Sequence, residues 1–163
     1  MKPRNRPRLL VLLLLALTAV LPACNNRSWE TGRNSSDLPT GTLEIQGDEP
    51  LVLEVDLALT GRAQARGLME VEEIPDDYGM VFLWSDSGKH GFYMKDTLIP
   101  LDIAWWNADG EIVDIQTMEP CTEDPCRTYV PAENHIGAVE VNAGLLESKG
   151  VEVGDRVTLT RAT

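Results

Sequence analysis

The sequence predicts a single α+β domain that is mostly β, a small closed or partly closed β-barrel with one or two short helices. The chain has 163 residues, of which 43% are hydrophobic and 25% are charged, the composition of one ordinary globular domain. Its apolar segments have the length of strands, and turn residues separate them at short intervals. Short strands with few helical segments are typical of small barrels and related folds.

The N-terminal segment predicts export. Four basic residues between positions 2 and 8 precede an apolar run, and no acidic residue occurs before Glu30. A basic region, an apolar region and small residues follow one another in this order in secretory signals, so we place a signal peptide at residues 1–23. The apolar run is shorter than the ~20 residues that a membrane-spanning helix needs.

Cys24 is the predicted lipidation site. Residues 21–24, LPAC, resemble a bacterial lipobox, although proline at the second position departs from the commonest motif. Acyl chains on Cys24 would anchor the protein at a membrane, in the periplasm or on the cell surface. The alternative is a secreted protein cut nearby, with Cys24 as a spare thiol. Residues 24–40 are predicted to form a flexible tether, and residues 41–163 the globular domain.

The charge of the chain argues against one class of partner. The formal net charge is −12, from 14 basic and 26 acidic residues. Four of the basic residues lie in the predicted signal peptide, so its removal leaves 10 basic against 26 acidic residues, a net charge of about −16. Such a surface repels nucleic acid, so we expect no nucleic-acid partner.

The globular part begins with a predicted strand and a short helix. In residues 51–58 the apolar side chains alternate with Glu54 and Asp56, which predicts a half-buried strand with both acids on the outer face. Thr60 then precedes GRAQARGLM, a predicted short helix with a threonine cap that ends or bends near Gly67.

Later apolar segments predict further strands. Residues 79–84 form a continuous apolar run of strand length. The other predicted strands are residues 92–95, 101–106, 112–118 and 138–142, with one or two more within 151–159. Asp109 and Gly110 lie between two of them, where a tight hairpin favours glycine after a residue that tolerates positive φ.

Cys121 and Cys126 are predicted to form a disulfide. They lie in the turn-rich loop EPCTEDPCRTYVP, and a nearby pair in an exported protein is usually bridged. Their C-x4-C spacing differs from the C-x-x-C of redox enzymes. A metal site would need His90 or His135 nearby, and both histidines fall in predicted loops. We therefore predict no metal site, and no motif implies a cofactor.

The stretch YMKDTLIPLD, residues 93–102, places charges beside strongly apolar residues. If residues 101–106 form a strand, Asp102 shares a face with Ala104 and Trp106 and is partly desolvated. An acid in that position needs Lys95, Arg66 or backbone N–H groups as partners.

The same stretch also allows a purely structural interpretation. Asp96 and Thr97 can close a local turn by bonding to the backbone, and Pro100 fixes the exit direction of the chain. Asp96, Thr97 and Asp102 would then hold one irregular loop against the barrel, because buried polar groups are often structural.

Four motifs resemble those of the family called domain of unknown function 192, or uncharacterised protein family 0127. They are RGLM at 66–69, GMVF at 79–82, FYMKDTLIPLDI at 92–103, and VEVNAG at 139–144 before VGD at 153–155. Tyr93 stands where tryptophan is common in the family, and Asp96 where asparagine is common. The resemblance, over about residues 51–159, implies a small mostly β fold, often exported or membrane-attached in bacteria and archaea. It implies no established reaction and no catalytic residues.

We predict first a non-catalytic envelope module that binds a glycan, a peptide or a protein. The expected ligand-binding residues are Arg66, Met69, Lys95, Asp96, Thr97, Asp102 and Trp106. Trp105 and Trp106 support it, because one ring could enter the core and the other could contact a ligand.

The alternative function is an envelope hydrolase, in which Asp102 acts as acid or base beside Asp96 and Lys95 tunes the pair. Its catalytic residues are otherwise unknown. An open cleft around Asp102 would favour the enzyme, whereas a buried Asp102 that stabilises the fold would favour the module.

Overall fold

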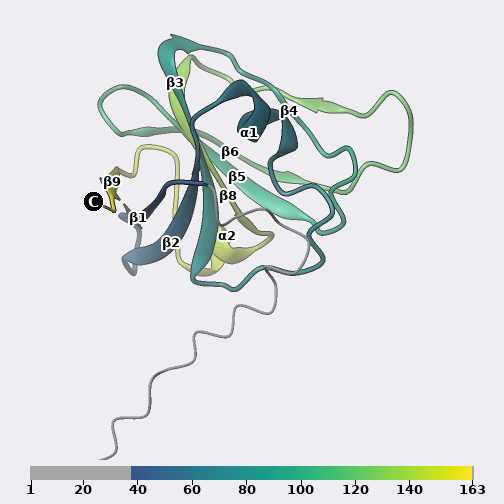
Figure 1. Ribbon diagram of the computed structural model, residues 1–163. Helices are drawn as coiled ribbons and strands as arrows, with labels where there is room; N and C mark the ends of the chain where they lie inside the picture. The colour runs from purple at the N-terminus through teal and green to yellow at the C-terminus, as the bar shows by residue number, and fades with distance from the viewer. Residues whose placement is uncertain (1–37, 163) are drawn as a thin grey trace, which may run out of the picture.

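The computed structural model describes residues 38–162 as one large sheet, a two-stranded ribbon and two short helices (Figure 1). The strands of the large sheet are β1 (Thr40–Ile45), β2 (Leu51–Ala58), β3 (Tyr78–Gly88), β5 (Leu101–Trp106), β6 (Ile112–Met118), β8 (His135–Asn142) and β9 (Val157–Arg161). The ribbon pairs β4 (Phe92–Tyr93) with β7 (Thr128–Tyr129), and the helices are α1 (Gly61–Arg66) and α2 (Leu145–Ser148). The predicted signal peptide, Cys24 and the tether up to residue 37 lie outside the described residues.

The large sheet is mixed and open. Its strand order is β6-β5-β8-β3-β2-β1-β9, and only β2 and β3 are parallel, with α1 in the connection between them. Among the described residues, the edges meet through one β-bridge, Glu111 with Arg156, rather than through paired strands. The mostly β fold with two short helices is therefore confirmed, but the sheet does not close into a barrel, because closure requires its edge strands to pair along their length.

The sheet separates two apolar clusters. One contains the inward side chains of β1 and β2 together with Leu145 and Leu146 of α2. The other lies between the sheet and a cover formed by the ribbon and by the segment after α1. Every residue of β5 is buried, since its side chains enter the two clusters alternately. The predicted alternation of β5 is thus correct, with no face exposed to solvent.

Of two local signals, the helix cap is confirmed and the hairpin turn is confirmed only for its glycine. The Oγ1 of Thr60 accepts a hydrogen bond from the Ala63 N–H at 3.2 Å and caps α1. Gly110 has a φ of 76° in the connection between β5 and β6, a backbone angle that favours glycine. Asp109 does not share the positive φ, and residues 107–111 form a longer loop than the tight hairpin that was predicted.

Asp56 corrects the prediction for β2. It was expected on an outer, solvated face, but it is only 3% exposed and accepts a hydrogen bond from the Tyr78 hydroxyl at 3.0 Å. The second half of β2 is buried on both faces, because Val55 and Leu57 enter one apolar cluster while Ala58, on the face of Asp56, enters the other. A buried acid of this kind requires hydrogen-bond partners.

The start of the sheet, the loop with the two cysteines and the length of the helices bear on three further predictions. The carbonyl of Pro39 accepts a hydrogen bond from the Leu57 N–H, and β1 starts at Thr40, so the end of the predicted tether already belongs to the sheet. The predicted disulfide between Cys121 and Cys126 is present, with an S–S distance of 2.04 Å. Neither helix within residues 38–162 is long and apolar enough to cross a bilayer.

Candidate ligand-binding site

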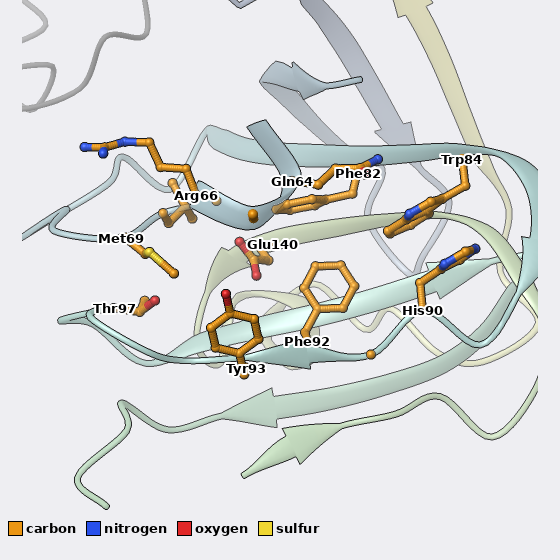
Figure 2. Close-up of a pocket in the computed structure, with 14 residues that line it drawn as sticks. Gln64, Arg66, Met69, Phe82, Trp84, His90, Phe92, Tyr93, Thr97 and Glu140 are labelled. Atoms are coloured by element: carbon orange, nitrogen blue, oxygen red, sulfur yellow. The ribbon is translucent and has the colours of Figure 1, made fainter. Parts of the chain in front are cut away.

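A pocket of about 310 Å³ lies where α1, the middle of β3 and β4 approach one another (Figure 2). The segment from α1 onward contributes Arg66 and Met69 to its wall, and β3 contributes Phe82 and Trp84. Further lining residues include His90, Phe92, Tyr93, Thr97 and Glu140. Its volume lies at the lower end of the range for small-molecule sites, and its mixed apolar and polar lining is typical of them.

Backbone geometry brings the two sides of the pocket mouth together. Gly67 ends α1 with a φ of 46°, and a Cβ there would lie 3.5 Å from the Phe82 ring and 3.8 Å from a Glu140 carboxylate oxygen. Glu70 and Asp96 also have positive φ, at 61° and 54°. The Glu70 N–H donates to the Asp96 carbonyl at 2.7 Å, which joins the turn after α1 to the turn after β4. Backbone conformations of this kind cost free energy and cluster at functional sites.

Glu140 provides the acid of the pocket. It lies in the middle of β8, which pairs with β3 on one side and β5 on the other, and it is 5% exposed. Val139 and Val141 enter one apolar cluster, so the alternation of the strand directs Glu140 to the opposite face. Figure 2 shows its carboxylate inside the pocket, near the rings of Phe92 and Tyr93. A carboxylate there can accept hydrogen bonds or pair with a cation.

Aromatic rings in contact with one another form the rest of the interior. The Phe82 and Phe92 rings meet edge to face with centroids 4.9 Å apart. Trp84 is edge-on to Phe92 at 6.0 Å and stacks on His90 at 4.4 Å. These are favourable ring geometries, so the aromatic wall is held in place by its own contacts.

His135 supports this wall from behind. It is fully buried and lies edge-on to Trp84 and His90, with ring centroids 5.1 and 5.2 Å away. Burial, and secondarily the charge of His90, lowers the pKa of His135 from 6.5 to about 4, while the Glu133 backbone acts in the opposite direction. His135 is therefore neutral at pH 7. His90 and His135 are adjacent, but within residues 38–162 no group of three or more His, Cys, Asp or Glu side chains could hold a metal ion.

Arg66 lies at the lip of the pocket. Its guanidinium points away from the interior in Figure 2, and its Nη2 donates to Oε2 of Glu70 at 3.3 Å. Both side chains of this pair are at least half exposed, so the pair adds little to stability. The positive charge of Arg66 therefore points away from the cavity.

The structure gathers only part of the predicted ligand-binding set. Arg66, Met69 and Thr97 line the pocket. Lys95 and Asp96 are exposed in the adjoining turn, outside the pocket lining. Thr97 is buried, and its hydroxyl donates to the Lys95 carbonyl at 3.4 Å, as expected for a local turn.

Asp102 lies outside the pocket and fastens two segments together. One carboxylate oxygen accepts from the Thr117 hydroxyl at 2.7 Å, and the other accepts from the N–H groups of Gly144 and Leu146 at 2.8 and 3.4 Å. Asp102 is 3% exposed, and neither Lys95 nor Arg66 is among these partners. Backbone N–H groups are among its partners, as expected for a structural acid, but Asp102 holds β6 and the start of α2 rather than the loop of Asp96 and Thr97.

The tryptophans of β5 also lie outside the pocket. Trp105 and Trp106 are 0% and 4% exposed, and a Cβ on Gly137 would lie 2.3 Å from the Trp106 ring. Both rings belong to the core, so Trp84 provides the tryptophan ring that lines the pocket.

Glu140 and Trp84 were missed from the sequence. Glu140 stands between valines in VEVNAG, and an acid inside so apolar a strand was a usable signal. No comparable signal marked Trp84, because only the pairing of β3 with β8 brings its strand beside that of Glu140.

These features define a class of protein: an acidic, mostly β domain with an aromatic pocket that contains one buried carboxylate. The chain belongs to the family domain of unknown function 192 (DUF192), described as "Uncharacterized ACR", which matches residues 42–159. The resemblance found in the sequence is thereby confirmed.

The chain is similar to one curated protein and to solved structures. A UPF0127 protein of Pyrococcus furiosus is 33% identical over 72 residues, or 44% of this chain and 55% of that protein, so the chain spans about half the length of this relative. A crystal structure from Novosphingobium aromaticivorans, of a protein of unknown function, is 30% identical, with a TM-score of 0.71 over 76% of this chain and 87% of that one. A Sinorhizobium meliloti protein, provisionally described as a transcription regulator, is 26% identical, with a TM-score of 0.68 over 75% of this chain and 95% of that one.

Proposed function

We propose that this protein is a non-catalytic binding module, exported and held at a membrane surface by lipid on Cys24, whose pocket around Glu140 receives a small ligand or one group of a larger partner. The observation that carries the binding role is the buried carboxylate of Glu140 within an aromatic wall. A charge in a strand centre is costly, so its placement at a cavity favours a role in recognition.

The position of Asp102 favours a module over a hydrolase. A catalytic acid must reach the substrate, whereas Asp102 is 3% exposed and is engaged by Thr117, Gly144 and Leu146. Asp96 is exposed in the turn after β4, on a different segment from these donors. Neither Asp96 nor Asp102 lines the pocket around Glu140, so the predicted catalytic pair does not meet there.

Export is supported by the order of basic, apolar and small residues before Cys24, and the disulfide fits an oxidising compartment. The regulator description of the Sinorhizobium protein does not suit this chain, because a net charge of −12 repels nucleic acid. We therefore place its partners among envelope glycans, peptides or proteins.

The binding role is tested by labelling the methionine methyl groups of the full chain with ¹³C and titrating peptidoglycan fragments, oligosaccharides, peptides and organic amines. Met69 lines the pocket, whereas Met118 is a buried reference on β6. We expect at least one compound to shift the Met69 signal saturably and leave the Met118 signal in place. If no compound in the panel shifts the Met69 signal, the proposed function is wrong.

The membrane anchor is tested separately. Cells that express the full chain are labelled with radioactive palmitate, and a Cys24→Ala variant is compared with a Cys121→Ala/Cys126→Ala variant. We expect only the Cys24 substitution to abolish labelling and membrane association. Labelling that survives in the Cys24 variant would exclude this cysteine as the anchor.

A further inference from the structure

We infer that the pocket recognises a primary organic ammonium group, with Glu140 as the counter-ion and the surrounding rings as the wall for the attached carbons. This inference rests on the proposed binding function and names its ligand class. The group belongs to an alkylamine, free or as part of a larger molecule.

The charges around the pocket favour a cation. Glu140 and Arg66 are its only acidic or basic lining residues apart from His90 within the described part of the chain. The Arg66 guanidinium points away from the interior in Figure 2 and pairs with Glu70, whereas the Glu140 carboxylate points into the pocket. The net charge of −12 adds a field that attracts cations and repels anions.

The aromatic rings favour an organic cation. Phe82, Phe92 and Tyr93 surround the Glu140 carboxylate in Figure 2, and Phe82 and Phe92 are fixed edge to face. Ring faces attract ammonium groups, and this attraction strengthens when water is excluded. A primary ammonium also donates N–H groups to a carboxylate in short, charge-assisted hydrogen bonds.

Other ligand chemistries fit less well. A metal ion would need several oxygen or nitrogen ligands, and residues 38–162 contain no group of three candidate donors. A neutral sugar would need several polar groups in the wall, yet the Gln64 side chain already donates to the Leu83 carbonyl at 2.8 Å. A carboxylate or phosphate ligand would be repelled by Glu140.

The experiment titrates the ¹³C-methionine-labelled full chain with n-butylammonium, n-butanol, butyrate and tetramethylammonium at pH 7 and constant ionic strength. We expect butylammonium to shift the Met69 signal saturably. Its affinity should exceed that of butanol at least tenfold, and butyrate should produce no shift. Tetramethylammonium should bind more weakly than butylammonium, because it has no N–H to donate.

Two variants locate the recognition. Glu140→Gln keeps the shape but removes the charge, and it should weaken butylammonium at least tenfold; exposed Glu147→Gln on α2 makes the same change in net charge and should alter the affinity less than twofold. Tyr93→Leu removes a ring that is 46% exposed, so the fold should tolerate it, and butylammonium binding should weaken severalfold. An unchanged Met118 signal reports that each variant is folded.

The inference is overturned if butylammonium fails to shift the Met69 signal, or if Glu140→Gln folds and binds it as tightly as the natural chain. If Glu140→Gln does not fold, the inference is overturned instead by a Tyr93→Leu variant that binds butylammonium as tightly as the natural chain. If butanol or an oligosaccharide shifts the Met69 signal saturably and butylammonium does not, the proposed binding function is retained and only the inference of an ammonium ligand is rejected. If no compound shifts the Met69 signal, both the proposed binding function and the ammonium inference are wrong.

Discussion

Asp102 shows how one buried carboxylate can connect distant parts of a chain. Its hydrogen bonds join β5 to Thr117 on β6 and to the start of α2, which lies 42 residues further along the chain at Gly144. The burial of Asp102 on the face of Ala104 and Trp106 follows from strand alternation. Its partners could not be predicted, because their approach depends on how β5, β6 and β8 are ordered in the sheet.

Replacing Asp102 by Asn should destabilise the domain by about 1–3 kcal/mol. The NH₂ group of the asparagine would face a backbone N–H or hydroxyl donor, and two donors cannot form a hydrogen bond. The free energy of unfolding in urea measures this loss. The matched control is Asp96→Asn, which is exposed at a φ of 54° that asparagine tolerates, and it should change stability by less than about 0.5 kcal/mol. Equal stability of Asp102→Asn and the natural chain would contradict the structural role.

His135 should make stability depend on pH. Its pKa is about 4 in the folded protein and 6.5 without burial, so the unfolded chain binds the proton first as the pH falls. The stabilisation is complete above pH 6.5 and is lost between about pH 6.5 and 4, by about 3 kcal/mol. Unfolding measured across this range should show a smaller loss for His135→Phe, which keeps an aromatic ring. Parallel curves for the two proteins would contradict the lowered pKa.

At the scale of elements, the sequence predicted strands well where alternation or an apolar run was long. The expected limits of β5 and β6, residues 101–106 and 112–118, match the structure. The expected strand at 92–95 is only the two-residue β4, because its partner β7 is equally short. Such short pairings depend on tertiary contacts rather than on local pattern.

The packing of the Trp106 ring against Gly137 of β8 should be sensitive to a single methyl group. A Cβ at Gly137 would lie 2.3 Å from that ring, so Gly137→Ala should destabilise the protein by about 1–3 kcal/mol or more. Gly61→Ala is the control, since a Cβ there meets no atom within 4 Å, and its effect should stay within about 0.5 kcal/mol. Urea unfolding of both variants measures the difference, and similar stabilities would show that β8 can shift away from the ring.

At the scale of the whole molecule, the excess of acidic over basic side chains should lower the stability of the folded protein at low ionic strength. The net charge of −12 repels itself in the compact state, and salt screens this repulsion. Raising NaCl from 20 to 300 mM should increase the melting temperature by roughly 2–6 °C, equivalent to about 1 kcal/mol for a domain of this size. Sucrose of equal osmolality is the control. A melting temperature that falls with salt would contradict this account of the charge.

The overall class could be predicted, but the pocket could not. Composition, strand-length segments and family motifs indicated a mostly β domain with one or two short helices, and the structure has two. The pocket forms because β8 is inserted between β3 and β5, which directs Glu140 toward Phe82, Trp84 and the ribbon. The hydrophobic period of one segment does not determine the order of strands in a sheet. The sequence therefore predicted Lys95 and Asp102, rather than Glu140, as ligand-binding residues.

The measurement that tests the central claim most directly is a search for intermolecular nuclear Overhauser effects between bound n-butylammonium and the labelled full chain. The account predicts contacts from the ligand methylenes to the Met69 methyl group and to the rings of Phe92 and Tyr93, with none in Glu140→Gln. Contacts confined to exposed apolar residues elsewhere, such as Val52 or Val153, would contradict it.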